Sequence, residues 1–196
     1  MLNVKKNINR PKGHKEKNMS VKNIELPIFG NIALENTDWE YKYCSSLWGY
    51  EFNGNPVDLD VNFIDVTDEN VKKVSKALND LEKLNKIGIE SFMQDFEEAG
   101  EAQSYITFWN EDVFGQIFSQ EEFEEFIQDT DREKSVEERL LSKLRLVRFG
   151  VYAESEDSFV TMDYAFGYDI DKGFRDNMLI VKLNQNYEVC EIVMEG

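Results

Sequence analysis

The sequence predicts an α+β domain in which helices are grouped mainly on one face of an antiparallel sheet. Three observations support this prediction. The order along the chain is strands, then helices, then strands, which is typical of the α+β class. The spacings between the C-terminal strands are short, which favours hairpins over parallel crossovers. The 196 residues include 14 Phe, 8 Tyr and 3 Trp, enough for one sizeable core despite a net charge of -17.

Strands are expected in the first third of the chain. Residues 24–34 are predicted to form a short edge strand, because a proline and a glycine interrupt them. An aromatic-rich strand is expected over residues 39–52. Asn53 and Gly54 follow it, and this dipeptide is a strong hairpin signal because both turn positions need a positive φ. Residues 56–64 then alternate apolar and polar side chains, as a half-buried strand does.

Helices are expected in the middle of the chain. Thr67 or Asp68 is suited to cap the first of them. Apolar residues then repeat at helical spacing up to Gly100, and Gly88 is expected to interrupt them, which predicts two helices or one kinked helix. The spacing of the apolar residues within 102–118 has an ambiguous period, and we predict a short helix and a loop there.

Two capping boxes mark the starts of further helices. Ser119 is followed at the third position by Glu122, and Ser135 is followed in the same way by Glu138. Beyond them, short runs rich in apolar residues are separated by turn residues. These runs predict four strands, over residues 145–154, 158–166, 177–184 and 187–194.

Acidic residues are concentrated in one segment. On a helix from residue 120, Phe123, Phe126 and Ile127 face inward, so the carboxylates face water. Like charges three and four residues apart repel, so such a helix serves either solubility or the binding of a cationic partner. We adopt the second hypothesis, a non-enzymatic protein that binds a basic protein as immunity or inhibitor proteins do. The partner-binding residues would then be Glu121, Glu122, Glu124, Glu125, Asp129 and Asp131.

The chain offers little catalytic machinery. Its single histidine is His14, near the N-terminus, which argues against Ser-His-Asp or Cys-His catalysis and against histidine-bound zinc. No standard phosphate-binding motif is present, so we expect no cofactor. Direct nucleic-acid binding is not expected, because phosphates repel so acidic a chain. The basic cluster of Lys143, Arg145 and Arg148 is interpreted as an anchor for internal ion pairs.

An alternative function stays open. Glycosidases need only two suitably spaced acids, so catalysis by carboxylates alone remains compatible with the composition. The aromatic and acidic residues Asp163, Tyr164, Tyr168 and Asp169 would suit a sugar pocket. The alternative is therefore a carboxylate-dependent enzyme or carbohydrate-binding protein with a pocket near residues 158–168. A simpler interpretation assigns these side chains to the core-facing and solvent-facing positions of one strand.

No metal site is predicted, although one segment copies part of a calcium-binding loop. Phe63 stands at the sixth place, where glycine makes the sharp turn of such loops, and the segment alternates like a strand. We therefore interpret its polar residues as a solvated strand face. The matching ligand positions, kept as the metal candidate, are Asp58, Asp60, Asn62 and Glu69.

Residues 1–18 are expected to be a disordered basic leader, because they hold six bases, one acid and no apolar periodicity. Lys15 and Glu16 lie just before Met19, as a translated ribosome-binding sequence would. The hypothesis is that Met19 is the native start. Residues 19–196 are then expected to form the single α+β domain.

The expected location is the cytoplasm, with no membrane contact. No run approaches the roughly 20 apolar residues of a membrane span, and no apolar signal sequence follows the basic leader. Cys44 and Cys190 are far apart and lack the spacing of a metal or redox motif, which fits reduced thiols. The sequence leaves open whether they pair.

The C-terminal strands resemble a bacterial family of unknown activity, catalogued as domain of unknown function two-thousand-and-four. The resemblance lies in an acid-aromatic strand, a strand of the form LxVxL and a strand of the form ExxxI, in residues 163–168, 177–183 and 188–192. It implies a cytosolic bacterial α+β protein and brings no catalytic residues with it. By analogy, it also suggests an immunity or accessory role.

Overall fold

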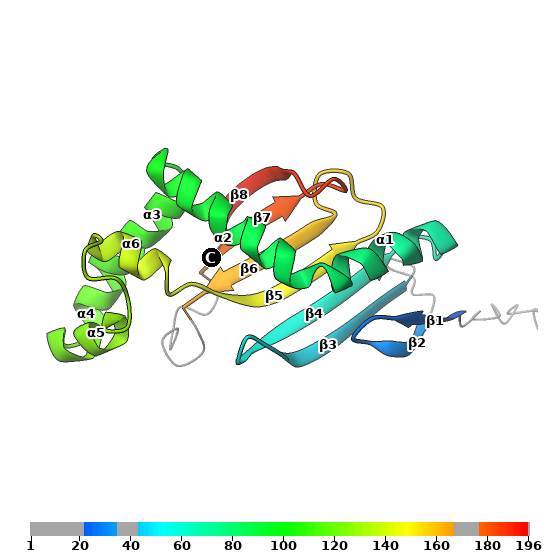
Figure 1. Cartoon of the computed structure of the whole chain (residues 1–196), viewed down its shortest axis with the longest axis horizontal. Coiled ribbons are helices and arrows are strands. Elements are labelled where there is room, and N and C mark those ends of the chain that lie inside the picture. The colour runs from blue at the N-terminus through cyan, green and yellow to red at the C-terminus, as the bar shows by residue number, and fades with distance from the viewer. Residues whose placement is uncertain (1–21, 35–42, 167–176, 196) are drawn as a thin grey trace, which may run out of the picture.

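A computed structural model describes residues 22–34, 43–166 and 177–195 (Figure 1). The α+β class and the order of strands, helices and strands are confirmed. Residues 1–18, expected to be a leader, lie outside the described residues. Within the described ranges, no helix has both the length and the apolar composition needed to cross a membrane.

A mixed sheet of six strands forms the centre of the molecule. In order across the sheet, the strands are β3 (Tyr43–Phe52), β4 (Asn55–Phe63), β5 (Arg145–Tyr152), β6 (Val160–Ala165), β7 (Met178–Leu183) and β8 (Val189–Glu195). Neighbouring strands are antiparallel except β4 and β5, which are parallel. The parallel pair arises because all the helices connect β4 to β5, and such a long crossover returns the chain in its original direction.

The N-terminal segment forms a hairpin of its own. The single strand expected over residues 24–34 is instead β1 (Lys22–Leu26) paired antiparallel with β2 (Gly30–Leu34). Ile28 and Gly30 at the turn both have a positive φ. The Asn53–Gly54 turn between β3 and β4 is confirmed, with φ values of 51° and 75°.

Two helices follow β4, but Gly88 does not separate them. They are α1 (Asp68–Asn79), capped by Thr67, and α2 (Leu81–Glu97), which continues through Gly88. The break falls at Asp80 instead. Gly88 has a different role, because a Cβ atom there would lie 2.5 Å from the hydroxyl oxygen of Tyr164. The glycine therefore lets α2 pack closely onto β6.

The loop expected within residues 102–118 is also absent, and this part of the chain stays helical. Its elements are α3 (Glu101–Phe108), the π-helix η1 (Trp109–Phe114) and α4 (Gly115–Ile117). Tyr105, Trp109 and Val113 are buried at intervals of four residues, a spacing that a wide helical turn keeps on one face. Both predicted capping boxes are present, at the starts of α5 (Gln120–Ile127) and α6 (Val136–Leu141).

The two faces of the sheet differ in character. Figure 1 shows α1 and α2 lying across one face, and the apolar side chains of β4, such as Leu59 and Val61, are buried in the core. Alternate side chains of a strand point to opposite faces, so Asp58, Asp60 and Asn62 project from the other side. We call that side the polar face, and it carries the candidate site.

Candidate binding site on the polar face of the sheet

Strand pairing brings charged residues from separate parts of the chain together. Arg148 of β5 lies opposite Asp58 of β4 and opposite Asp163 of β6. In the neighbouring row, Lys182 of β7 lies opposite Glu191 of β8. The polar face therefore carries alternating charges across several strands.

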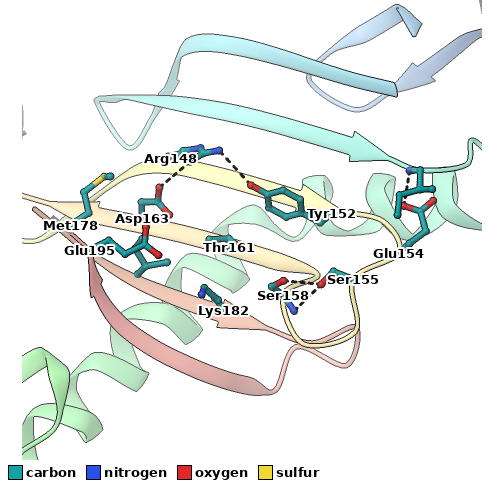
Figure 2. A pocket seen from close by; sticks show the side chains of 12 residues that line it. Arg148, Tyr152, Glu154, Ser155, Ser158, Thr161, Asp163, Met178, Lys182 and Glu195 are labelled. Carbon is teal, nitrogen blue, oxygen red and sulfur yellow. Dashed lines mark hydrogen bonds and ion pairs between the residues drawn. The ribbon is translucent and has the colours of Figure 1, made fainter. Parts of the chain in front are cut away.

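A groove of about 450 Å³ opens on this face (Figure 2). Its charged and hydroxyl-bearing lining consists of Arg148, Tyr152, Glu154, Ser155, Ser158, Thr161, Asp163, Lys182 and Glu195. Its apolar lining consists of Ile64, Met178 and Ile180. The volume lies within the range of small-molecule pockets.

Asp163 is the buried charge of the groove. It is only 1% exposed, and neither carboxylate oxygen accepts a hydrogen bond from the described residues. Its ion pair with Arg148 spans 3.6 Å from Oδ2 to Nη1, too long for a hydrogen bond (Figure 2). Burial raises the pKa of Asp163 to about 6, and the charges of Glu195 and Asp60 act in the same direction while Arg148 opposes them.

Arg148 offers Asp163 its charge but no hydrogen bond, because its donors are engaged elsewhere. Its Nε donates a 2.7 Å hydrogen bond to Asp60 Oδ2, and its Nη2 donates to the Tyr152 hydroxyl at 3.4 Å. Asp60 also accepts a hydrogen bond from Ser46. The guanidinium is thus held toward β4 rather than over Asp163.

The prediction of an internal ion-pair anchor is confirmed for two of the three basic residues. Arg148 pairs with Asp60 and Asp163, and Lys143 pairs with Asp129 at 2.8 Å. Arg145 instead donates to Asn55 Oδ1.

The other charges of the groove wall are also fixed. Lys182 Nζ lies 2.7 Å from Glu191 Oε2, and this hydrogen bond raises the pKa of the lysine. The hydroxyls of Ser155 and Ser158 are 2.7 Å apart. Glu195, at the end of β8, forms no ion pair with the described residues.

Glu154 supports one end of the groove. Its carboxylate accepts hydrogen bonds from the backbone amides of Ile64 and Asp65 and from the side chain of Asn70. These bonds tie the turn after β5 to the connection between β4 and α1. The carboxylate of Glu154 is therefore a structural element of the wall.

The aromatic-acid cluster expected near residues 158–168 is divided between the two faces. Asp163 lies in the groove, but it is buried and not solvent-facing as strand alternation suggested. Tyr164 points into the core, where its hydroxyl donates to Asn85 Oδ1 at 2.9 Å. Tyr168 and Asp169 lie outside the described residues.

The acidic segment from Glu121 to Asp131 is exposed, but some of its carboxylates are already used. Glu122 completes the capping box of α5, and Asp129 pairs with Lys143. Asp131 accepts a hydrogen bond from the backbone of Glu133. The other outward carboxylates on α5 belong to Glu121, Glu124 and Glu125, which we call the acidic face of α5. Of these, Glu124 accepts a 2.7 Å hydrogen bond from Gln120 Nε2.

Aromatic packing anchors α5 from its opposite side. The rings of Phe123 and Phe126 lie 5.3 Å and 5.5 Å from that of Phe114, measured between centroids. Phe126 also contacts Phe166, which follows β6. The acidic face is therefore presented by a helix that is fastened to the core.

The residues of the calcium-loop pattern do not converge. Asp58, Asp60 and Asn62 lie on strand β4, where Asp58 accepts the Gly49 amide. Glu69 is on α1 and pairs with Lys73, which lowers its pKa. In the part of the chain that the structure describes, no three histidine, cysteine or acidic side chains are grouped to hold a metal ion.

The sequence predicted a pocket near residues 158–168 and singled out Asp163, but it did not predict the other charged residues of the groove. Glu195 and Lys182 became neighbours of Asp163 only through the pairing of β6, β7 and β8. The order of strands was a usable signal, because consecutive hairpins align alternate residues on one face.

The chain matches no protein-family model, no curated protein and no solved structure.

Proposed function

We propose that this protein is a non-enzymatic binding protein whose partner is a basic protein, as for immunity and inhibitor proteins. The observation that supports this most directly is the acidic face of α5, where three exposed carboxylates lie on a helix anchored in the core. Glu121 is three residues from Glu124 and four from Glu125, so their charges repel. A cationic partner would relieve that repulsion.

The nearby cations do not neutralise this face. Lys143 is paired with Asp129 and lies 4.9 Å from the centre of the Phe126 ring. Arg139 donates to the Thr130 hydroxyl and to the backbone carbonyl of Ile127. Both bases hold the segment after α5 in place, so neither of them offsets the charge of the acidic face of α5. Such a surface speeds association with a basic protein by electrostatic steering.

The alternative is a carboxylate-dependent enzyme or a carbohydrate-binding protein, and the groove near residues 158–168 favours it. It is the weaker candidate because Tyr164, one of the two tyrosines expected to line a sugar pocket, faces the core. We therefore retain binding without catalysis as the proposed function. The family resemblance of the C-terminal strands is the support for proposing a location in the bacterial cytoplasm.

The test is capture of a basic partner from native lysate by immobilised protein, with identification by mass spectrometry. We expect retention at about 50 mM salt and release near 0.5 M, because screening weakens exposed charge pairs. Glu121→Gln, Glu124→Gln and Glu125→Gln together should reduce the affinity for the captured protein at least tenfold, about 1.4 kcal/mol.

A matched control removes the same charge from other exposed positions, with Glu51→Gln, Glu82→Gln and Glu156→Gln. This variant should bind the partner as the wild type does. Equal loss in the two triple variants would assign the binding to net charge alone and reject the acidic face of α5. Failure to retain any basic protein at low salt would reject the proposed function.

A further inference from the structure

We propose that the groove on the polar face binds a small organic cation, an alkylammonium or guanidinium compound, with its charged group at the carboxylate of Asp163. The proposal goes beyond the basic protein partner, because it concerns a different surface and a free small molecule. Its main support is that Asp163 is 1% exposed while neither oxygen accepts a hydrogen bond from the described residues. Buried carboxylates are normally hydrogen-bonded, so this one is short of donors.

The described cations beside Asp163 do not supply those donors. Arg148 donates through Nε to Asp60 and reaches Asp163 only at 3.6 Å. Lys182, on the next strand, is held by Glu191 at 2.7 Å. Figure 2 shows Lys182 separate from Asp163, with the dashed contact of Asp163 leading only to Arg148. Since no described side chain donates to it, Asp163 is suited to a donor that a ligand brings.

The charge balance of the groove favours a positive donor over a neutral one. Arg148 and Lys182 are each offset by a carboxylate of their own, Asp60 and Glu191. Glu195 also lines the groove and forms no ion pair with the described residues. Among the described residues, Asp163 and Glu195 thus leave a negative surplus in the groove, and a cleft with a net negative charge concentrates cations.

The size and the apolar part of the lining indicate a ligand with a body as well as a charged group. The volume of about 450 Å³ exceeds what one ammonium group fills. Met178 and Ile180 line the groove beside Asp163 and offer contact to methylene groups. Ser158 and Thr161 add hydroxyls that accept further hydrogen bonds from an amine.

The binding should weaken in acid. Asp163 faces Arg148 on β5, Asp60 on β4, Lys182 on β7 and Glu195 on β8. Burial raises its pKa to about 6, so the carboxylate is charged at pH 8 and largely protonated at pH 5. A protonated Asp163 no longer attracts a cation, and affinity at pH 5 should fall at least tenfold.

The experiment is calorimetric titration of the full chain at pH 8 with three probes. These are agmatine, n-butylamine and n-butanol, the last being the uncharged match of the second. We expect both cations to bind with dissociation constants of about 1 mM or lower, and no binding of the alcohol. Asp163→Asn should weaken agmatine at least tenfold, in line with loss of a charge-assisted hydrogen bond. Glu156→Gln, an exposed carboxyl in the turn after β5, should change nothing.

Several outcomes would overturn the proposal. They are equal binding of butylamine and butanol, full affinity in Asp163→Asn, or no heat with either cation at about 10 mM. Binding of a lysine-rich peptide without binding of free amines would reassign the groove to a protein partner and reject the small-molecule ligand. If Asp163→Asn fails to fold, judged by its near-ultraviolet circular dichroism, Glu195→Gln replaces it, with a reduced agmatine affinity expected. The triple variant of the acidic face of α5 should keep full agmatine affinity, so the two proposals can fail separately.

Discussion

Gly88 of α2 faces the hydroxyl group of Tyr164 on β6 so closely that a Cβ atom at position 88 would lie 2.5 Å from the phenol oxygen. The same hydroxyl donates to Asn85 Oδ1, one turn earlier on α2. The ring of Tyr164 also packs edge-on against Phe92, with 4.9 Å between the centroids. The helix and the strand are thus joined around one tyrosine, and the glycine makes room for it.

We expect Gly88→Ala to lower the free energy of unfolding by about 1–3 kcal/mol, because the added methyl group overpacks this contact. Denaturant unfolding measures the change. Gly115→Ala is the matched control, since its Cβ would meet nothing closer than a backbone oxygen at 3.8 Å and its φ is helical. That control should be neutral or slightly stabilising. A loss of stability in Gly115→Ala equal to that in Gly88→Ala would contradict the close packing.

The pKa of Asp163 predicts how stability depends on pH. Its folded-state pKa of about 6 lies above the ordinary value of 3.8, so the folded protein holds this proton more tightly than the unfolded chain does. The stabilising contribution is complete below pH 3.8 and is lost as pH rises through about 6. Between pH 4 and pH 7, the unfolding free energy of the wild type should fall relative to Asp163→Asn by roughly 2–3 kcal/mol. A difference that stays constant or rises over this interval would reject the raised pKa.

Arg148 is expected to hold down the pKa of Asp163 and to compensate two carboxylates. Arg148→Gln should therefore raise the pKa of Asp163 above its wild-type value and destabilise the protein by about 1–2 kcal/mol, less than the loss of a fully buried pair because the Arg148 side chain is 45% exposed and its charge is screened by solvent. NMR titration of the Asp163 carboxyl carbon and denaturant unfolding measure the two effects. Lys182→Gln, which removes the neighbouring cation, should shift the Asp163 pKa less. The reverse order of the two shifts would assign the main cation to Lys182.

The cap of α5 is expected to stabilise the support of the acidic face. Ser119→Ala removes the side-chain acceptor for the Glu122 amide and should cost about 1 kcal/mol of unfolding free energy. Ser75→Ala, in the middle of α1, serves as the control and should be nearly neutral. Hydrogen exchange of the first turn of α5 should also speed up in Ser119→Ala. Unchanged protection there would show that aromatic packing alone fixes the helix start.

Elements with strong local signals could be predicted from the sequence. The Asn53–Gly54 turn and the capping boxes at Ser119 and Ser135 depend only on residues close in sequence, and all three are present. The predicted break at Gly88 was wrong. A glycine in a helical pattern can mark either an interruption or a close contact, and only the position of Tyr164 decides between them. Local propensity yields to tertiary packing in such cases.

The groove could be predicted only in part. Strand periodicity placed Asp163 and Tyr164 on opposite faces, and that separation is observed. Periodicity could not show that Asp163 is buried, because burial on the polar face depends on which strands flank β6. Nor could it place Glu195 beside Asp163, since that contact depends on the order of β6, β7 and β8.

The parallel pairing of β4 with β5 has a consequence for synthesis on the ribosome. Among the described strands, this is the only pairing that joins the β3–β4 hairpin to the four C-terminal strands β5 to β8. The hairpin leaves the exit tunnel before the helical segment, and β5 is translated only after that segment is complete. Until then the inner edge of β4 is an unpaired strand next to exposed apolar side chains, which is a hazard for aggregation. The sheet can close only late, so the nascent chain is expected to need protection while its helices are still being made.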